Sequence, residues 1–75
     1  MKELLTILAT NLVDDPQQVV VTEEETDGVI TLKLKVAQAD MGKVIGKQGR
    51  IARAIRTLVK AAAITAKKKV NVEIV

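Results

Sequence analysis

Hydrophobic positions follow two different periods along this chain. A helical period predicts an amphipathic helix over residues 2–13, whose apolar positions are Leu4, Leu5, Leu8, Leu12 and Val13. Asp14-Asp15-Pro16 ends this helix, because the residue before a proline avoids helical dihedrals. A run of β-branched residues then predicts a strand over residues 18–25. Strict alternation of apolar and polar residues predicts a second strand from Ile30 to Val36.

Turn and cap residues predict how these segments are connected. Asp27-Gly28 lies between the two strands and is typical of a two-residue hairpin turn. Asp40 is placed to cap the N-terminus of a short helix over residues 41–45. A longer helix over residues 50–66 and a last strand over residues 69–75 complete the pattern.

The resulting order, α-β-β-α-α-β, predicts one α+β domain over residues 1–75. Its β-α-α-β core spans about residues 29–75 and follows the first helix and strand. The hairpin strands are expected to pair antiparallel. The last two strands are joined through two helices and are expected to lie parallel. This predicts a three-stranded mixed sheet with three helices packed on one face.

The amino-acid composition excludes several classes of function, although it says less about the fold. The 75 residues are 48% hydrophobic and include no Cys, His, Phe, Tyr or Trp. This removes thiol chemistry, the commonest general base and the aromatic platforms on which many RNA-binding folds stack bases. No nucleophile, base and orienting group can be assembled, so we expect no enzyme, no metal site and no cofactor. We also expect a cytoplasmic protein without a membrane segment.

Charge is divided unevenly between the two halves of the chain. Residues 1–40 hold three lysines and eight acidic residues, a net charge of −5, whereas residues 41–75 hold nine basic residues and one glutamate, a net charge of +8. A basic half-molecule is suited to a polyanionic partner.

The segment Gly46-Lys47-Gln48-Gly49 is the candidate for contact with that partner. Glycines at both ends permit positive φ and a close approach of the backbone. The segment leads into a helix N-terminus, whose free N–H groups and dipole attract phosphate. The spacing excludes a Walker A loop, because only three residues separate Gly42 from Gly46 and Gln48 follows the lysine. It also lacks the G-x-G of a dinucleotide fingerprint.

The run from Val44 to Ile51, with Ile55 beyond it, closely resembles the V-I-G-x-x-G-x-x-I hallmark of KH domains. The element order is similar to the type II, prokaryotic arrangement. With Asp14-Asp15-Pro16 after the first helix, the chain resembles the bacterial KhpA family of single-KH-domain proteins. The resemblance implies an RNA chaperone that pairs with a second KH protein, KhpB, in regulation linked to cell shape, elongation and wall biogenesis.

The helix over residues 50–66 is expected to present two faces. The face predicted to pack on the sheet consists of Ile51, Ile55, Leu58 and Ala62. The opposite face carries a basic stripe of Arg50, Arg53, Arg56 and Lys60, and the run Lys67–Lys69 follows the helix. Ile64 falls near the basic stripe, and with its small neighbours it is a candidate dimer contact.

These features predict a clamp for about four nucleotides of single-stranded RNA. The predicted contacts are Lys43, Val44, Ile45, Gly46, Lys47, Gln48, Gly49, Arg50 and Arg53. We expect a homodimer, or a heterodimer with a KhpB-like protein, and no small-molecule substrate. Two alternatives stay open. The two helices could form a DNA-binding helix-turn-helix, or the domain could be a protein-interaction subunit that binds no nucleic acid.

Overall fold

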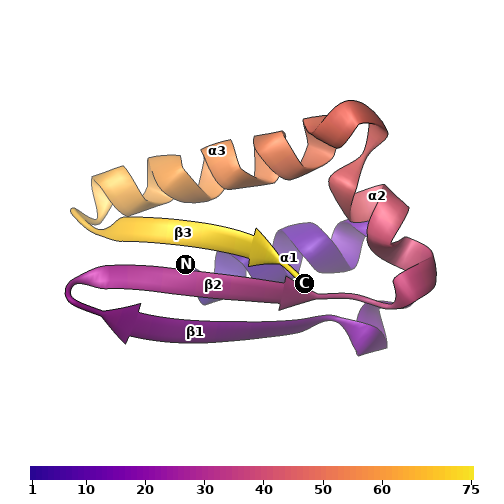
Figure 1. Cartoon of the computed structure of the whole chain (residues 1–75), viewed down its shortest axis with the longest axis horizontal. Coiled ribbons are helices and arrows are strands. Elements are labelled where there is room, and N and C mark those ends of the chain that lie inside the picture. Colours follow the sequence, from indigo (N-terminus) through magenta and orange to yellow (C-terminus); the bar gives the residue numbers. More distant parts are fainter.

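Figure 1 shows the computed structural model, which describes all residues from 1 to 75. The predicted order α-β-β-α-α-β is confirmed, with α1 (Lys2–Leu12), β1 (Val20–Thr26), β2 (Val29–Lys35), α2 (Met41–Ile45), α3 (Arg50–Thr65) and β3 (Lys69–Ile74). A 3-10 turn at Pro16–Gln18 delays the first strand, so it begins at Val20 and not at residue 18. Not one of the helices combines the length and apolar character that crossing a membrane requires.

The sheet has the order β1-β2-β3 and is mixed, as predicted. β1 and β2 are antiparallel, and β2 and β3 are parallel. Thr26 is paired with Val29, so only Asp27 and Gly28 form the turn, with φ of 52° and 78°. Positive φ at both turn residues is what a type I′ hairpin turn requires.

The core lies between one face of the sheet and the helices. Ile30, Leu32 and Leu34 on β2 are buried, while the residues between them point to the open face. Because strand residues alternate between the two faces of a sheet, burial of every second residue means that only one face is covered. The helices therefore pack on that face. The largest fully buried side chains are those of Leu5, Leu32, Leu34, Val44 and Val59.

The predicted packing face of α3 is wrong in part. The buried residues of this helix are Ala52, Ile55, Val59 and Ala63. Leu58 is 51% exposed, and Ile51 and Ala62 are only half-buried. Ala52, Ile55, Val59 and Ala63 face the core, whereas Ile51 and Leu58 lie on the flank that faces α1. The prediction, which rested on hydrophobicity alone, therefore placed the centre of the packing face of α3 about one residue too early.

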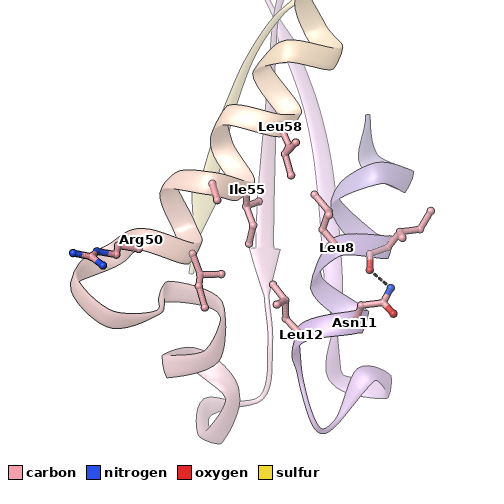
Figure 2. Close-up of a pocket in the computed structure, with 9 residues that line it drawn as sticks. Leu8, Asn11, Leu12, Arg50, Ile55 and Leu58 are labelled. Atoms are coloured by element: carbon pink, nitrogen blue, oxygen red, sulfur yellow. Dashed lines mark hydrogen bonds between the residues drawn. The ribbon is translucent and has the colours of Figure 1, made fainter.

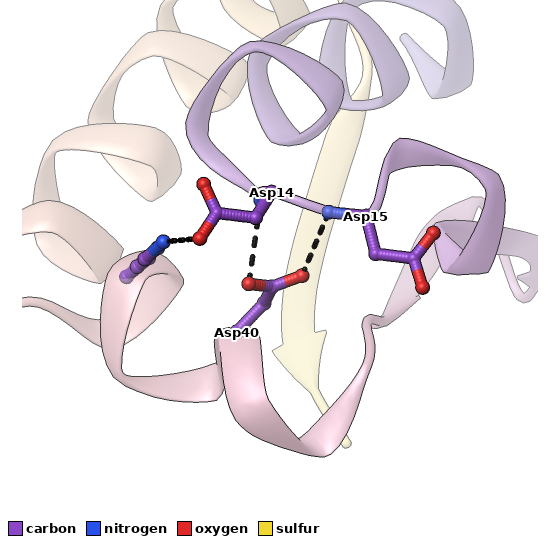
Figure 3. A network of polar contacts seen from close by, with 4 residues as sticks. Asp14, Asp15 and Asp40 are labelled. Atoms are coloured by element: carbon purple, nitrogen blue, oxygen red, sulfur yellow. Dashed lines mark hydrogen bonds and ion pairs between the residues drawn. The ribbon is translucent and has the colours of Figure 1, made fainter.

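Asp40 occupies the N-cap position of α2, as predicted, but its side chain does not cap the helix. Asp40 precedes α2 but has helical dihedrals (φ −97°, ψ −4°), and its side chain makes no cap hydrogen bond. Its carboxylate is buried and accepts hydrogen bonds from the backbone N–H groups of Asp14 (3.3 Å) and Asp15 (3.1 Å), as Figure 3 shows. Asp40 therefore ties the segment after α1 to the start of α2.

Candidate nucleic-acid interface

The loop between α2 and α3 has a backbone that depends on its glycines. Gly46 has φ 73° and ψ 175°, and Gly49 has φ 73° and ψ 14°. A Cβ on Gly46 would lie 2.5 Å from Cγ1 of Ile51, whereas a Cβ on Gly49 would meet nothing within 4 Å. Gly46 is thus required by both conformation and close packing, and Gly49 by conformation alone.

Between these glycines the chain presents polar groups and an open helix end. Lys47 and Gln48 are exposed, and Gln48 is itself left-handed at φ 58°. α3 begins at Arg50 with neither a side-chain cap nor an acidic residue in its first turn. The first N–H groups of a helix have no intrahelical acceptor, and the positive end of the helix dipole lies there. The N–H groups of Gly49 and Arg50 donate to the backbone oxygens of Gly46 and Lys47 in the 3-10 turn. An anion placed against the loop would therefore meet the positive end of the helix dipole and the N–H groups that follow in the first turn of α3.

The predicted contact residues around the loop differ in how accessible they are. Lys43, Arg50 and Arg53 are exposed, and Ile45 is 39% exposed. Val44 is 0% exposed and belongs to the hydrophobic core, so its side chain is not accessible for the RNA contact that the sequence predicts. Its helical position turns it inward beneath the loop, where it anchors α2.

Lys43 already has an acidic neighbour. Its ammonium donates a hydrogen bond to Oδ2 of Asp14, the residue whose backbone N–H contacts Asp40 (Figure 3). The hydrogen bond to the Asp14 carboxylate is the main factor that raises the pKa of Lys43 above its ordinary value. Lys43 thus stays charged at neutral pH, but a phosphate would have to compete with Asp14 for it.

One residue of the basic stripe of α3, Arg56, contacts β3. The guanidinium Nε of Arg56 donates a hydrogen bond to the backbone oxygen of Val72 at 3.4 Å, which fixes this side of the helix against the edge strand. The two ion pairs of the structure are Lys33–Glu24 at 4.0 Å and Lys43–Asp14. The cations of α3 and of the loop tip therefore have no carboxylate partner.

An apolar groove, which the sequence did not predict, opens on the other flank of α3. It has a volume of about 500 Å³ and lies between α1 and α3, and Figure 2 shows its lining. Leu8 and Leu12 line it from α1, and Ile55 and Leu58 from α3. The guanidinium of Arg50 points outward at its edge, away from Leu8 and Leu12 (Figure 2). The sequence does hold one indication of this groove, because α1 and α3 both carry more apolar residues than are needed to cover the sheet.

Comparisons with known proteins agree with these features. The sequence model described as "KhpA/KhpB, KH domain" matches residues 2–74. RNA-binding protein KhpA of Clostridium perfringens is 63% identical over 75 residues, covering 100% of both chains. RNA-binding protein KhpA of Bacillus subtilis is 51% identical over 74 residues, covering 99% of this chain and 91% of that protein.

A solved structure shares the fold at low sequence identity. Era in complex with MgGDPNP and nucleotides of 16S ribosomal RNA superposes with a TM-score of 0.69 and 20% identity, covering 97% of this chain and 28% of the Era chain. The curated relatives are named as RNA-binding proteins and not as enzymes, in agreement with the non-enzymatic prediction. The match assigns the two helices to a KH fold, which disfavours the helix-turn-helix alternative. This chain belongs to the KhpA/KhpB family of KH domains.

Proposed function

We propose that this protein binds single-stranded RNA and that the loop Gly46–Gly49 clamps the strand by its backbone. The observation that carries the proposal is a glycine-bounded loop, with an exposed lysine, that leads directly into an uncapped helix N-terminus. A KH loop of this kind holds about four nucleotides. The relatives of Clostridium perfringens and Bacillus subtilis are named RNA-binding proteins, which supports RNA as the ligand.

Each contact residue has a role in this proposal. The loop and the first turn of α3 supply N–H donors, while Lys47 and Arg50 supply charge. The exposed part of Ile45 forms an apolar surface for the bases, and Val44 supports it from the core. Arg53 continues the positive surface along α3, and Lys43 contributes once it is released from Asp14.

Affinity from one domain is expected to be modest and strongly dependent on salt. The chain has no aromatic residue, so bases cannot stack on a ring. With about three phosphates contacted, log affinity should fall by about 2 for each tenfold rise in salt concentration.

The test replaces Lys47 and Gln48 with Asp. The double variant K47D/Q48D places two carboxylates where phosphate should lie, and both glycines and the core remain. Aspartate also tolerates the left-handed dihedrals of position 48. We expect loss of RNA binding in a fluorescence anisotropy titration, with an unchanged circular dichroism spectrum.

A matched control makes the same charge change away from the loop. Lys2 and Gln17 are both exposed, on α1 and on the 3-10 turn after it. The variant K2D/Q17D should bind RNA within a few-fold of the wild type. Full binding by folded K47D/Q48D would contradict the clamp, and absence of binding by the wild type would favour the protein-interaction alternative.

The wider role implied by the family belongs to the same proposal. It is an RNA chaperone in the cytoplasm, which acts with itself or with a KhpB-like partner in post-transcriptional regulation linked to cell shape and elongation. Ile64 is 76% exposed and lies on α3 beside the small residues Ala61 and Thr65. We place the dimer contact there. Sedimentation of Ile64→Lys as a monomer beside a wild-type dimer would support it, and an unchanged mass would contradict it.

A further inference from the structure

Positive charge continues well beyond the loop without acidic partners. Arg56, Lys60 and the run Lys67–Lys69 are all exposed, and neither of the two ion pairs of the structure involves them. α3 contains no acidic residue over its 16 positions. Such uncompensated charge repels itself and is most stable against a polyanion.

These cations extend from the middle of α3 to the end of the helix that lies away from the loop. Arg56 is held against β3 by its hydrogen bond to Val72, and Lys60 follows one turn later on the same flank. A helix of 16 residues is about 24 Å long. Lys67–Lys69 therefore lie about that far from the loop, where α3 returns into β3 (Figure 1).

The end of α3 is closed by a backbone motif in which a lysine occupies the glycine position. The N–H of Lys68 donates to the oxygen of Ala63 at 2.8 Å, and the N–H of Lys67 donates to the oxygen of Ile64 at 3.0 Å. This pair of bonds is a Schellman motif, whose left-handed residue is usually glycine. Here that residue is Lys67, with φ 58°. A side chain kept in an unfavourable conformation suggests a function for the side chain.

We propose that Lys67–Lys69 form a second anchor for the phosphate backbone of the RNA strand held at the Gly46–Gly49 loop. Arg56 and Lys60 line the path between the two anchors. The proposal rests on the proposed function of the loop. A stacked strand advances about 3.4 Å per nucleotide, so about 24 Å corresponds to about seven nucleotides, and to fewer when the strand is extended. The protein therefore binds strands longer than the four nucleotides of the loop more tightly than short ones.

The acidic hairpin sets the end of this path. Lys69 pairs with Val29, so the turn Asp27-Gly28 lies beside the second anchor. Glu23, Glu24 and Glu25 are exposed on β1 beyond it. A strand that crossed from β3 towards β1 would meet negative charge, so the RNA path ends at the lysines.

The experiment compares two RNA lengths and two sets of variants. Oligouridylates of about four and about twelve nucleotides are titrated against the whole chain at several salt concentrations. The test variant is K67G/K68Q/K69Q, in which glycine suits the left-handed position. The matched control, K2Q/K33Q/K35Q, removes the same charge elsewhere. The double variant K68Q/K69Q leaves position 67 unchanged in case the triple variant folds poorly.

The outcomes separate the second anchor from the first. The test variant should bind the short RNA as the wild type does. For the long RNA it should bind roughly tenfold more weakly, with a salt slope less steep by about 2. An unchanged slope for both lengths, or an equal change in the control, would overturn the second anchor. Loss of both lengths in K47D/Q48D would then still support the loop, whereas binding of the long RNA by K47D/Q48D at full strength would overturn the loop.

Discussion

α3 begins and ends beside a left-handed residue, but the chain uses a different amino acid at each end. Gly49 precedes the helix with φ 73°, and Lys67 follows it with φ 58°. At the first end the proposed ligand meets backbone N–H groups, which a side chain would obstruct. At the second end the proposed ligand meets the side chain itself. The difference suggests that the backbone is the binding group at the loop, and the ammonium group at the opposite end.

The largest effect should come from Gly46, where conformation and packing both demand glycine. Gly46→Ala would place a Cβ 2.5 Å from Ile51 and force a side chain onto φ 73°, ψ 175°. We expect unfolding free energy to fall by about 2–4 kcal/mol in urea denaturation. Gly42→Ala is the control, because Gly42 is helical and its Cβ would meet nothing within 4 Å. The control should be neutral or stabilised by about 0.5–1 kcal/mol. Equal losses in both variants would show that the loop is not strained as described.

Gly49→Ala should have a smaller effect on stability and a clear effect on binding. Its Cβ has open space, so only the left-handed dihedrals oppose the change, at about 1–2 kcal/mol. Gly49→Asn keeps a residue that tolerates this conformation and should lose less stability. Both variants carry a side chain beside the proposed phosphate site, and both should bind RNA more weakly by anisotropy titration. If Gly49→Asn bound RNA as tightly as the wild type, the backbone at this end would not need to be bare.

Lys67→Gly should change stability in the opposite direction. Glycine adopts positive φ without steric cost, so the variant should gain about 1 kcal/mol in unfolding free energy. The same change removes one cation and should weaken binding of long RNA only. A residue with a purely structural role would not lose binding while stability rises. A loss of stability in Lys67→Gly would mean that the lysine side chain itself stabilises the end of α3.

The parts of this structure that follow from the sequence are those fixed by neighbouring residues. Asp27-Gly28 predicts its hairpin because the turn type depends on those two residues alone. Alternation from Ile30 onward gives β2 and its buried face. The glycine-bounded loop was found in the same way, since its conformation is set by Gly46 and Gly49.

The parts that did not follow from the sequence depend on residues far apart in the chain. The partners of the Asp40 carboxylate lie 25 and 26 positions earlier, so local capping rules placed Asp40 at the correct helix end but missed the groups that its side chain contacts. The groove between α1 and α3 requires the relative placement of two helices. The burial of Val44 likewise depends on how α2 is tilted against the core.

The smallest effect should come from the acidic neighbour of the loop. Asp14→Asn removes the carboxylate from Lys43 and leaves the backbone N–H that Asp40 accepts. Because the hydrogen bond to Asp14 raises the pKa of Lys43, the pair stabilises the fold below the ordinary lysine pKa, and this stabilisation is lost as pH rises through the higher folded value. At neutral pH the lysine is charged in both proteins, so binding can be compared directly. We expect Asp14→Asn to bind RNA a few-fold more tightly at low salt, since phosphate no longer competes with Asp14, and to lose this gain at high salt.

Lys43→Gln should bind with the same affinity whether or not Asp14 is replaced. An equal gain from Asp14→Asn in the Lys43→Gln background would show that Asp14 acts through general charge and not through Lys43.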